Sequence, residues 1–151
     1  PGRAEICNGV DDNCDGKVDD PEICPDCTQR SSGVSLFAFC VRARDWSTAQ
    51  ANCESLGGSL AVPQDEDELA FVVATIAEIG QSDEWWIGAN DLTTEDVWVD
   101  VDETPLAYLP WVEGNPNGGD AENCAILWQG AGGRWKDREC AVERPSVCRL
   151  P

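Results

Sequence analysis

Oxygen-bearing side chains alternate in a short acidic stretch near the start of the chain, DDNCDGKVDDPE, from Asp11 to Glu22. Counted from Asp11, it matches the loop pattern D-x-[DN]-x-[DN]-G-x5-E, in which alternate side chains converge on one cation because the chain turns sharply at a glycine, here Gly16. Carboxylate, amide and carbonyl oxygens are the ligands that calcium prefers. The predicted calcium ligands are Asp11, Asn13, Asp15, the carbonyl of Lys17, Asp19 and Glu22.

The flanks of this loop differ from those of an EF-hand. No helical pattern precedes it, Pro21 interrupts any helix that would follow it, and Cys14 lies inside it. The stretch CNGVDDNCDGKVDD instead resembles short cysteine-flanked, Asp-rich metal-binding motifs of secreted bacterial proteins, and also thrombospondin-type calcium loops. In that setting Cys7 pairs with Cys14, and Cys24 is the expected unpaired cysteine. The alternative is an acidic linker whose match to the pattern is fortuitous.

The composition limits the function classes. The chain has 29 acidic and 10 basic residues, a net charge of -19, and no His. Nucleic acid and anionic membranes are recognised through Lys and Arg, so neither is an expected partner, whereas cationic partners, including metal ions, fit the charge better. The lack of His excludes Ser/His/Asp and Cys/His catalytic sites and His-ligated zinc, so we do not expect an enzyme.

Nine cysteines are scattered along the 151 residues, and this number is typical of exported, disulfide-bonded proteins. Four of them, Cys7, Cys14, Cys24 and Cys27, could instead ligate zinc, but the six residues between the first two exceed the usual spacing of two to four. Disulfides and an extracellular or cell-surface location are therefore expected. No segment approaches the roughly 18 consecutive apolar residues that a membrane span requires.

Two segments have helical patterns. In WSTAQANCESLGG, Ser47 and Gln50 have the spacing of a capping box, which predicts a helix from Thr48 to Leu56. In PQDEDELAFVVATIAEIG, an acidic first turn after Pro63 suits the positive end of a helix dipole. The apolar face of this second helix is predicted to consist of Leu69, Val72, Val73 and Ile76.

The remaining pattern is typical of short strands and long loops. The stretch from Val34 to Val41 predicts a strand with bulky side chains on alternate positions, and WWIGA, VWVD, CAIL and SVC predict further strands. The loop from about Asp102 to Asn123 is long enough to suggest a functional role. We predict an α+β architecture, with an irregular appendage at residues 1–24 and one folded domain at residues 25–151.

Four motifs in a fixed order carry a resemblance to a known family. WSTAQANCESLGGSLA, WWIGANDLTTEDVWVD, PWVEGNPNGGDAENC and GRWKDREC followed by SVC resemble the C-type lectin-like domain over about Cys27 to Leu150. The resemblance implies two helices, antiparallel sheets and a long irregular loop region. It also implies the disulfides Cys53–Cys148 and Cys124–Cys140, and a third in which Cys40 pairs with Cys27, which we favour, or with Cys24.

Sugar-binding members of that family hold a calcium ion that binds vicinal sugar hydroxyls together with its protein ligands. The corresponding positions of this chain are Asn115, Asn117, Glu122, Lys136 and Asp137. Asn117, Glu122 and Asp137 match the family's ligands, whereas Asn115 stands in place of Glu and Lys136 in place of Asn. Lys136 offers no acceptor and a positive charge. We therefore expect the Lys136 ammonium to replace the cation and to pair with Glu122 and Asp137.

The family's auxiliary calcium position is half preserved. Asp91 and Glu95 match it, while Gly118 and Asn123 occupy positions where further acidic ligands often lie. The favoured interpretation is that Asp91 and Glu95 are solvated loop residues.

The tryptophans allow a similar choice between core packing and sugar stacking. Burial is expected for Trp46, Trp86, Trp111 and Trp135, and the pattern leaves Trp98 and Trp128 undecided.

Together these features predict an extracellular, non-enzymatic recognition module that binds a glycan or a protein through its long loop without a loop calcium. The alternative is a calcium-dependent carbohydrate-binding lectin.

Overall fold

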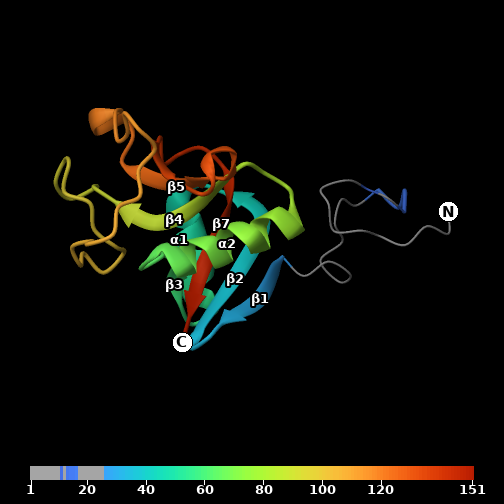
Figure 1. Cartoon of the computed structure of the whole chain (residues 1–151). Helices are drawn as coiled ribbons and strands as arrows, with labels where there is room; N and C mark the ends of the chain where they lie inside the picture. Colours follow the sequence, from blue (N-terminus) through green and yellow to red (C-terminus); the bar gives the residue numbers. More distant parts are fainter. Residues whose placement is uncertain (1–10, 12, 17–25) are drawn as a thin grey trace.

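The computed structural model describes residue 11, residues 13–16 and residues 26–151. The predicted α+β architecture is confirmed there as two helices and one mixed sheet (Figure 1). In chain order the elements are β1 (Cys27–Ser32), β2 (Ser35–Arg44), α1 (Trp46–Ser55), β3 (Ser59–Leu60), α2 (Glu66–Ile79), β4 (Glu84–Asn90), β5 (Cys124–Trp128), β6 (Trp135–Arg138) and β7 (Arg144–Leu150), with short 3-10 turns η1 (Gly119–Ala121) and η2 (Gln129–Ala131).

The seven strands form one sheet in the order β1-β2-β7-β4-β5-β6, with β3 paired to β7. All pairings are antiparallel except the single contact of β4 with β7, where Trp86 lies opposite Ser146. Strands β2 and β7, the first and last long strands, therefore lie side by side in the middle of the sheet. The chain between them forms most of the rest of the domain.

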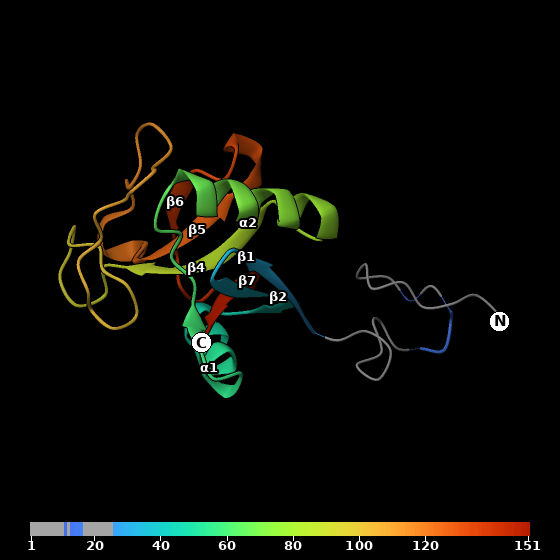
Figure 2. The same ribbon diagram turned by 60° about the horizontal axis from the view of Figure 1, so that its bottom comes forward.

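The two helices cover opposite faces of this sheet (Figure 2). Phe37 and Phe39 of β2 pack in one core cluster with α2, whereas Ala38 and Cys40 pack in a second cluster with α1. All four side chains are fully buried. The strand predicted from Val34 to Val41 corresponds to β2, and its bulky side chains Phe37 and Phe39 alternate with smaller ones as predicted. Both faces of β2 are covered, so this alternation does not expose either face.

Both helices begin at an aspartate cap. Asp65 accepts from the Glu68 amide at the start of α2, where the acidic first turn was predicted. The capping box predicted at Ser47 and Gln50 is wrong, because Asp45 caps α1 by accepting from the Thr48 amide at 2.8 Å. Helix α1 therefore starts two residues before the predicted Thr48.

A long irregular segment, residues 91–123, connects β4 to β5 and lies at one edge of the molecule, in yellow and orange in Figure 1. The VWVD stretch predicted as a strand forms only isolated bridges, in which Val99 pairs with Asn90 and Pro105. Aromatic contacts fix this segment to the sheet: the ring centroid of Trp111 lies 4.7 Å from that of Trp98 and 5.9 Å from that of Trp135.

Three disulfides brace the domain as expected: Cys27–Cys40, Cys53–Cys148 and Cys124–Cys140. The predicted pairing of Cys7 with Cys14 is wrong, because Cys14 is a free, exposed cysteine. Its backbone has a positive φ of 60° within the tight acidic turn. Cys7 and Cys24 lie outside the described residues. No helix in the described part of the chain is long and apolar enough to span a bilayer.

Candidate functional site

Asp137 anchors the end of the long loop to the sheet. It lies on β6 opposite Ala125 of β5 and is only 1% exposed. Its Oδ2 accepts hydrogen bonds from the backbone amides of Asn117, at 2.9 Å, and Gly118, at 2.7 Å. Its Oδ1 is buried without a hydrogen-bond partner, which leaves one carboxylate oxygen available to a ligand.

Glu122 lies beside the same stretch of loop. A Cβ placed on Gly118 would lie 2.4 Å from Glu122 Oε2, so the carboxylate of Glu122 rests directly against the Gly118 backbone. The peptide bond between Asn115 and Pro116 is cis, and the Asn115 amide donates to the Val112 carbonyl at 2.9 Å. The loop backbone at Asn117 and Gly118 therefore contacts Asp137, and Glu122 lies against Gly118.

Lys136 does not join this group. Its Nζ lies 3.6 Å from the centroid of the Trp128 ring, a cation–π contact. Among the described residues, none of the ion pairs joins Lys136 to Glu122 or Asp137. The predicted pairing is wrong because consecutive strand residues point to opposite sides, and Asp137 already faces the loop.

A second group of carboxylates lies in the first part of the long loop. Ligand oxygens of Asp91, Glu95 and Asp96 lie within 4.8 Å of one another. Asp91 is 3% exposed; its Oδ2 accepts from the Asp96 amide at 2.9 Å, while its Oδ1 is buried without a partner. The interpretation of Asp91 as a solvated loop residue is therefore wrong.

The second half of the loop closes over this group. The Asp91 amide donates to the Asn123 carbonyl at 3.1 Å, and the buried Asn123 Oδ1 has no partner. Asn123 Nδ2 in turn donates to the Asp120 carbonyl at 3.2 Å. This arrangement of carboxylate and amide oxygens suits a hard divalent cation such as calcium.

The carboxylates of this group raise one another's pKa values. Burial raises the pKa of Asp91, and the negative charge of Asp96 adds to the effect. Desolvation, a hydrogen bond with Asp120 and repulsion from Asp91 raise the pKa of Glu95 to about 7. No Lys or Arg occurs between residues 91 and 123, so no basic side chain of the loop itself offsets this charge.

Sequence reasoning missed Asp96 and Asp120, and it left the role of Trp128 undecided. Asp96 follows Glu95 directly, and the run of acidic residues without a basic one was a usable signal for it. Asp120 joins the group only through the fold of the loop. The contact of Trp128 with Lys136 depends on the pairing of β5 with β6, which no local pattern indicates.

The tryptophans divide largely as expected. Trp86 and Trp135 are fully buried, Trp46 is 8% exposed, and Trp111 is half-buried against the core. Of the two left undecided, Trp98 is 7% exposed and Trp128 is half-buried beneath Lys136. All of these rings lie in a core cluster or pack against one, so sugar stacking is not their main role.

The described part of the acidic N-terminal stretch forms a tight turn. Asp11 accepts from the amides of Asp15, at 3.2 Å, and Gly16, at 2.9 Å, while Asn13 Oδ1 accepts from the Asp15 amide at 2.9 Å. Gly16 has a φ of 91°, which provides the predicted turn. The oxygens of the first three predicted ligands are thus close together. The other three, Lys17, Asp19 and Glu22, lie outside the described residues.

Comparison with known proteins agrees with this geometry. The family model of the lectin C-type domain matches residues 42–150. The chain belongs to the C-type lectin domain family. A second model, a metal-binding motif of the MopE copper-binding type, matches residues 1–20.

Several relatives support the assignment. Human tetranectin is 32% identical over 121 residues, which cover 78% of this chain and 60% of tetranectin. The carbohydrate-recognition domain of cow CD23, solved in the presence of a GlcNAc2Man3 oligosaccharide, is 30% identical with a TM-score of 0.72, covering 83% of this chain and 94% of that one. A calcium-independent type II antifreeze protein is 25% identical with the same TM-score, covering 80% and 89%. The fold therefore occurs both in a carbohydrate-recognition domain and in an antifreeze protein, and these relatives fit a recognition module.

Proposed function

We propose that this domain is an extracellular module, without enzymatic activity, that binds a glycan or protein ligand through Asn115, Asn117, Glu122, Lys136 and Asp137 without a calcium ion among them. The observation that carries the proposal is the position of Lys136. Its ammonium lies on Trp128, so this position provides no oxygen ligand beside Asp137. Asn115 further removes one negative charge from the set.

The interior of the loop is the better candidate for calcium in this domain. Asp91, Glu95 and Asp96 converge there, with two unpartnered buried oxygens from Asp91 and Asn123. A cation at this group would link the two halves of the loop and hold the ligand-binding residues in place. The disulfides support an extracellular setting, because such bonds persist outside the reducing cytosol.

The alternative function is calcium-dependent carbohydrate binding. The unpartnered Asp137 Oδ1, next to Glu122 and Asn117, favours it, since a cation there would complete the coordination of that oxygen. The CD23 domain shows that a relative of 30% identity was solved together with an oligosaccharide.

A glycan array and a panel of basic and neutral peptides, each probed with calcium and with chelator, distinguish the two functions. According to the proposal, some ligands should still bind after calcium is removed by the chelator. Their binding should weaken in the variant Asn117→Ala. Glycan binding that requires calcium and disappears in Asp137→Asn would instead establish the alternative. The double variant N115E/K136N supplies a matched gain-of-function control, because it restores the two missing ligands and should create calcium-dependent glycan binding.

For the N-terminal motif we propose calcium as the preferred metal. Its predicted ligands are all oxygens, and calcium favours such a set, whereas copper prefers nitrogen and sulfur donors. Titration calorimetry with calcium and with copper, on the wild type and Asp15→Ala, tests this. Equal calcium heats in both proteins, or tighter copper binding that requires Asp15, would overturn it.

A further inference from the structure

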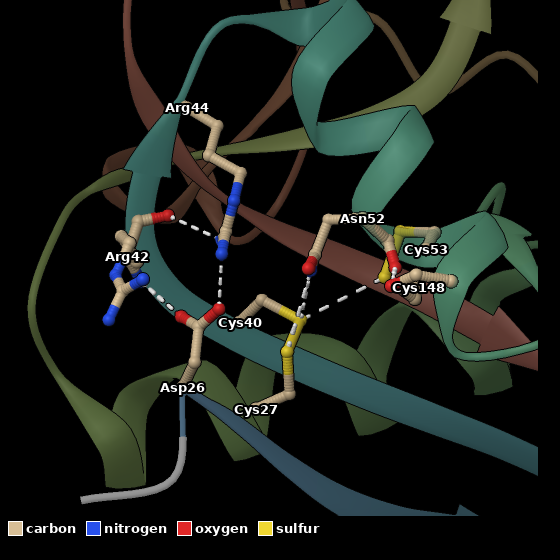
Figure 3. Close-up of polar contacts among 9 residues, drawn as sticks. Asp26, Cys27, Cys40, Arg42, Arg44, Asn52, Cys53 and Cys148 are labelled. Carbon is tan, nitrogen blue, oxygen red and sulfur yellow. Dashed lines mark hydrogen bonds and ion pairs between the residues drawn. A yellow bond between two sulfur atoms is a disulfide. The ribbon is translucent and has the colours of Figure 1, made fainter. Parts of the chain in front are cut away.

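Two disulfides lie in contact on the face of the sheet that α1 covers. Cys27–Cys40 joins β1 to β2, and Cys53–Cys148 joins α1 to β7. The Sγ atoms of Cys40 and Cys148 are only 3.9 Å apart (Figure 3). The register explains this proximity: Cys148 lies opposite Ala38, so Cys40 is two residues further along β2 and its side chain points to the same face.

The four sulfurs differ in accessibility. Cys40, Cys53 and Cys148 are fully buried, whereas Cys27 is half-buried on the edge strand β1. A thiol in solution therefore meets Cys27 first. Attack there makes Cys40 the leaving group, and its thiolate forms inside the domain.

Asn52 of α1 is placed to stabilise that thiolate. Its Nδ2 lies 3.5 Å from Cys40 Sγ and 3.7 Å from Cys27 Sγ. A hydrogen bond to the charged form favours it, so this amide promotes Cys40 as both leaving group and nucleophile.

Contacts independent of the disulfide keep the strands in place after this first step. The Asp26 carboxylate pairs with Arg44 and accepts from the Arg42 amide at 3.0 Å (Figure 3). The Asp26 carbonyl accepts from the Val41 amide at 2.9 Å. Reduction of Cys27–Cys40 therefore leaves Cys40 next to Cys148.

We propose that Cys27–Cys40 is a thiol-exchange site that passes its reaction on to Cys53–Cys148. A small thiol, such as glutathione, attacks Cys27 and forms a mixed disulfide, which releases the Cys40 thiolate. That thiolate attacks Cys148 Sγ, the Cys40–Cys148 bond forms, the Cys53–Cys148 bond breaks, and Cys53 leaves as a thiolate. The second step conserves the number of disulfides and needs no further oxidant or reductant.

The exchange replaces a link between a helix and the sheet with a link inside the sheet. Strands β2 and β7 are already paired through their backbones, so the new bond adds no connection between elements. Helix α1 loses its covalent tie to β7. An extracellular thiol would thus loosen α1 while the long loop keeps its own bridge, Cys124–Cys140.

Graded treatment of the full chain with reduced glutathione, followed by alkylation and peptide mapping, tests the proposal. A Cys14→Ser background removes the free thiol found among the described residues. We expect glutathione on Cys27, alkylated Cys53 and a Cys40–Cys148 cross-link to appear together, before Cys124–Cys140 opens. Alkylated Cys40 beside an intact Cys53–Cys148 would overturn it.

Two variants sharpen the test. Cys27→Ala leaves Cys40 as a permanent thiol, so the Cys40–Cys148 cross-link should form without added glutathione. In Cys27→Ala/Cys40→Ala the relay is absent, and glutathione should open Cys53–Cys148 about tenfold more slowly, because an internal thiolate acts at a high effective concentration. Equal rates in the wild type and the double variant would contradict the relay, and the mapping of the unmutated disulfides decides the question if either variant fails to fold.

Discussion

A single carboxylate, Asp137, connects the last part of the long loop to the sheet. It holds two loop amides while it is almost completely buried. A buried amide that loses its acceptor costs about 1–3 kcal/mol. The position therefore matters for the shape of the loop whether or not a cation also binds there.

Asp137→Ala should lower the free energy of unfolding by about 2–4 kcal/mol, because it leaves the amides of Asn117 and Gly118 without an acceptor. Asp137→Asn keeps one oxygen acceptor in place and should cost clearly less. Urea unfolding measures both variants. Equal losses would show that the charge, and not the acceptor, supports the loop.

The sequence motifs indicated the positions of the expected site residues, but not the contacts that their side chains make. Asp137 and Glu122 both contact the loop backbone at Asn117 and Gly118. The partner of Lys136 was wrong because a family match aligns positions, while the side to which a strand residue points decides what it touches. The burial of Asp91 was missed for a related reason: its neighbours come from the far end of the same loop.

The raised pKa of Glu95 gives the loop a pH dependence. The folded state holds this proton up to about pH 7, whereas the usual Glu pKa is 4.5. The folded state therefore binds more protons between these values, so stability should fall as the pH rises from about 4.5 to 7 and then level off.

Calorimetry in chelator should detect this decline in melting temperature, and Glu95→Gln should reduce it. Calcium should oppose the decline at pH 7.5, because it neutralises the same carboxylates. Glu113→Gln, at an exposed site of the same loop, is the matched control. A decline that persists unchanged in Glu95→Gln would place its origin elsewhere.

At the scale of the elements, the start of α1 allows two candidate N-cap residues, Asp45 and Ser47, to be compared. Asp45 accepts from the Thr48 amide, which lowers the pKa of Asp45, whereas Ser47 only donates to Asp45 at 3.3 Å. Asp45→Ala should therefore destabilise the protein by about 1 kcal/mol, and Ser47→Ala by much less. Chemical denaturation of the two variants measures this difference. A larger loss for Ser47→Ala would restore the capping box that the sequence suggested.

Most elements could be predicted because their signals are local. The acidic turn and apolar face of α2 identify that helix, and the apolar runs of β4, β5 and β7 identify those strands. Strands β1, β3 and β6 were missed. The segments CTQRSS and WKDR are polar and β3 has only two residues, so their strand structure comes from pairing with β2, β5 and β7. Non-local pairing is the information that a local pattern lacks.

For the whole molecule, the division of the chain at residues 24 and 25 is a testable proposal. Both core clusters and all three described disulfides lie between residues 27 and 148. Asp26 supplies the outermost contacts, to Val41, Arg42 and Arg44. We therefore propose that residues 25–151 fold without the N-terminal motif.

The fragment 25–151 should therefore melt within about 2 °C of the full chain in chelator, since it retains every contact of the two cores. A matched fragment, 33–151 with Cys40→Ser, removes β1 and the Cys27–Cys40 bridge, and should be less stable by about 3 kcal/mol, the loss that the entropy of a short closed loop implies. Calcium should raise the melting temperature of the 25–151 fragment, because the carboxylates of Asp91, Glu95 and Asp96 remain in it. If 25–151 melts as early as the shorter fragment, the N-terminal motif is part of the folded unit and the boundary lies elsewhere.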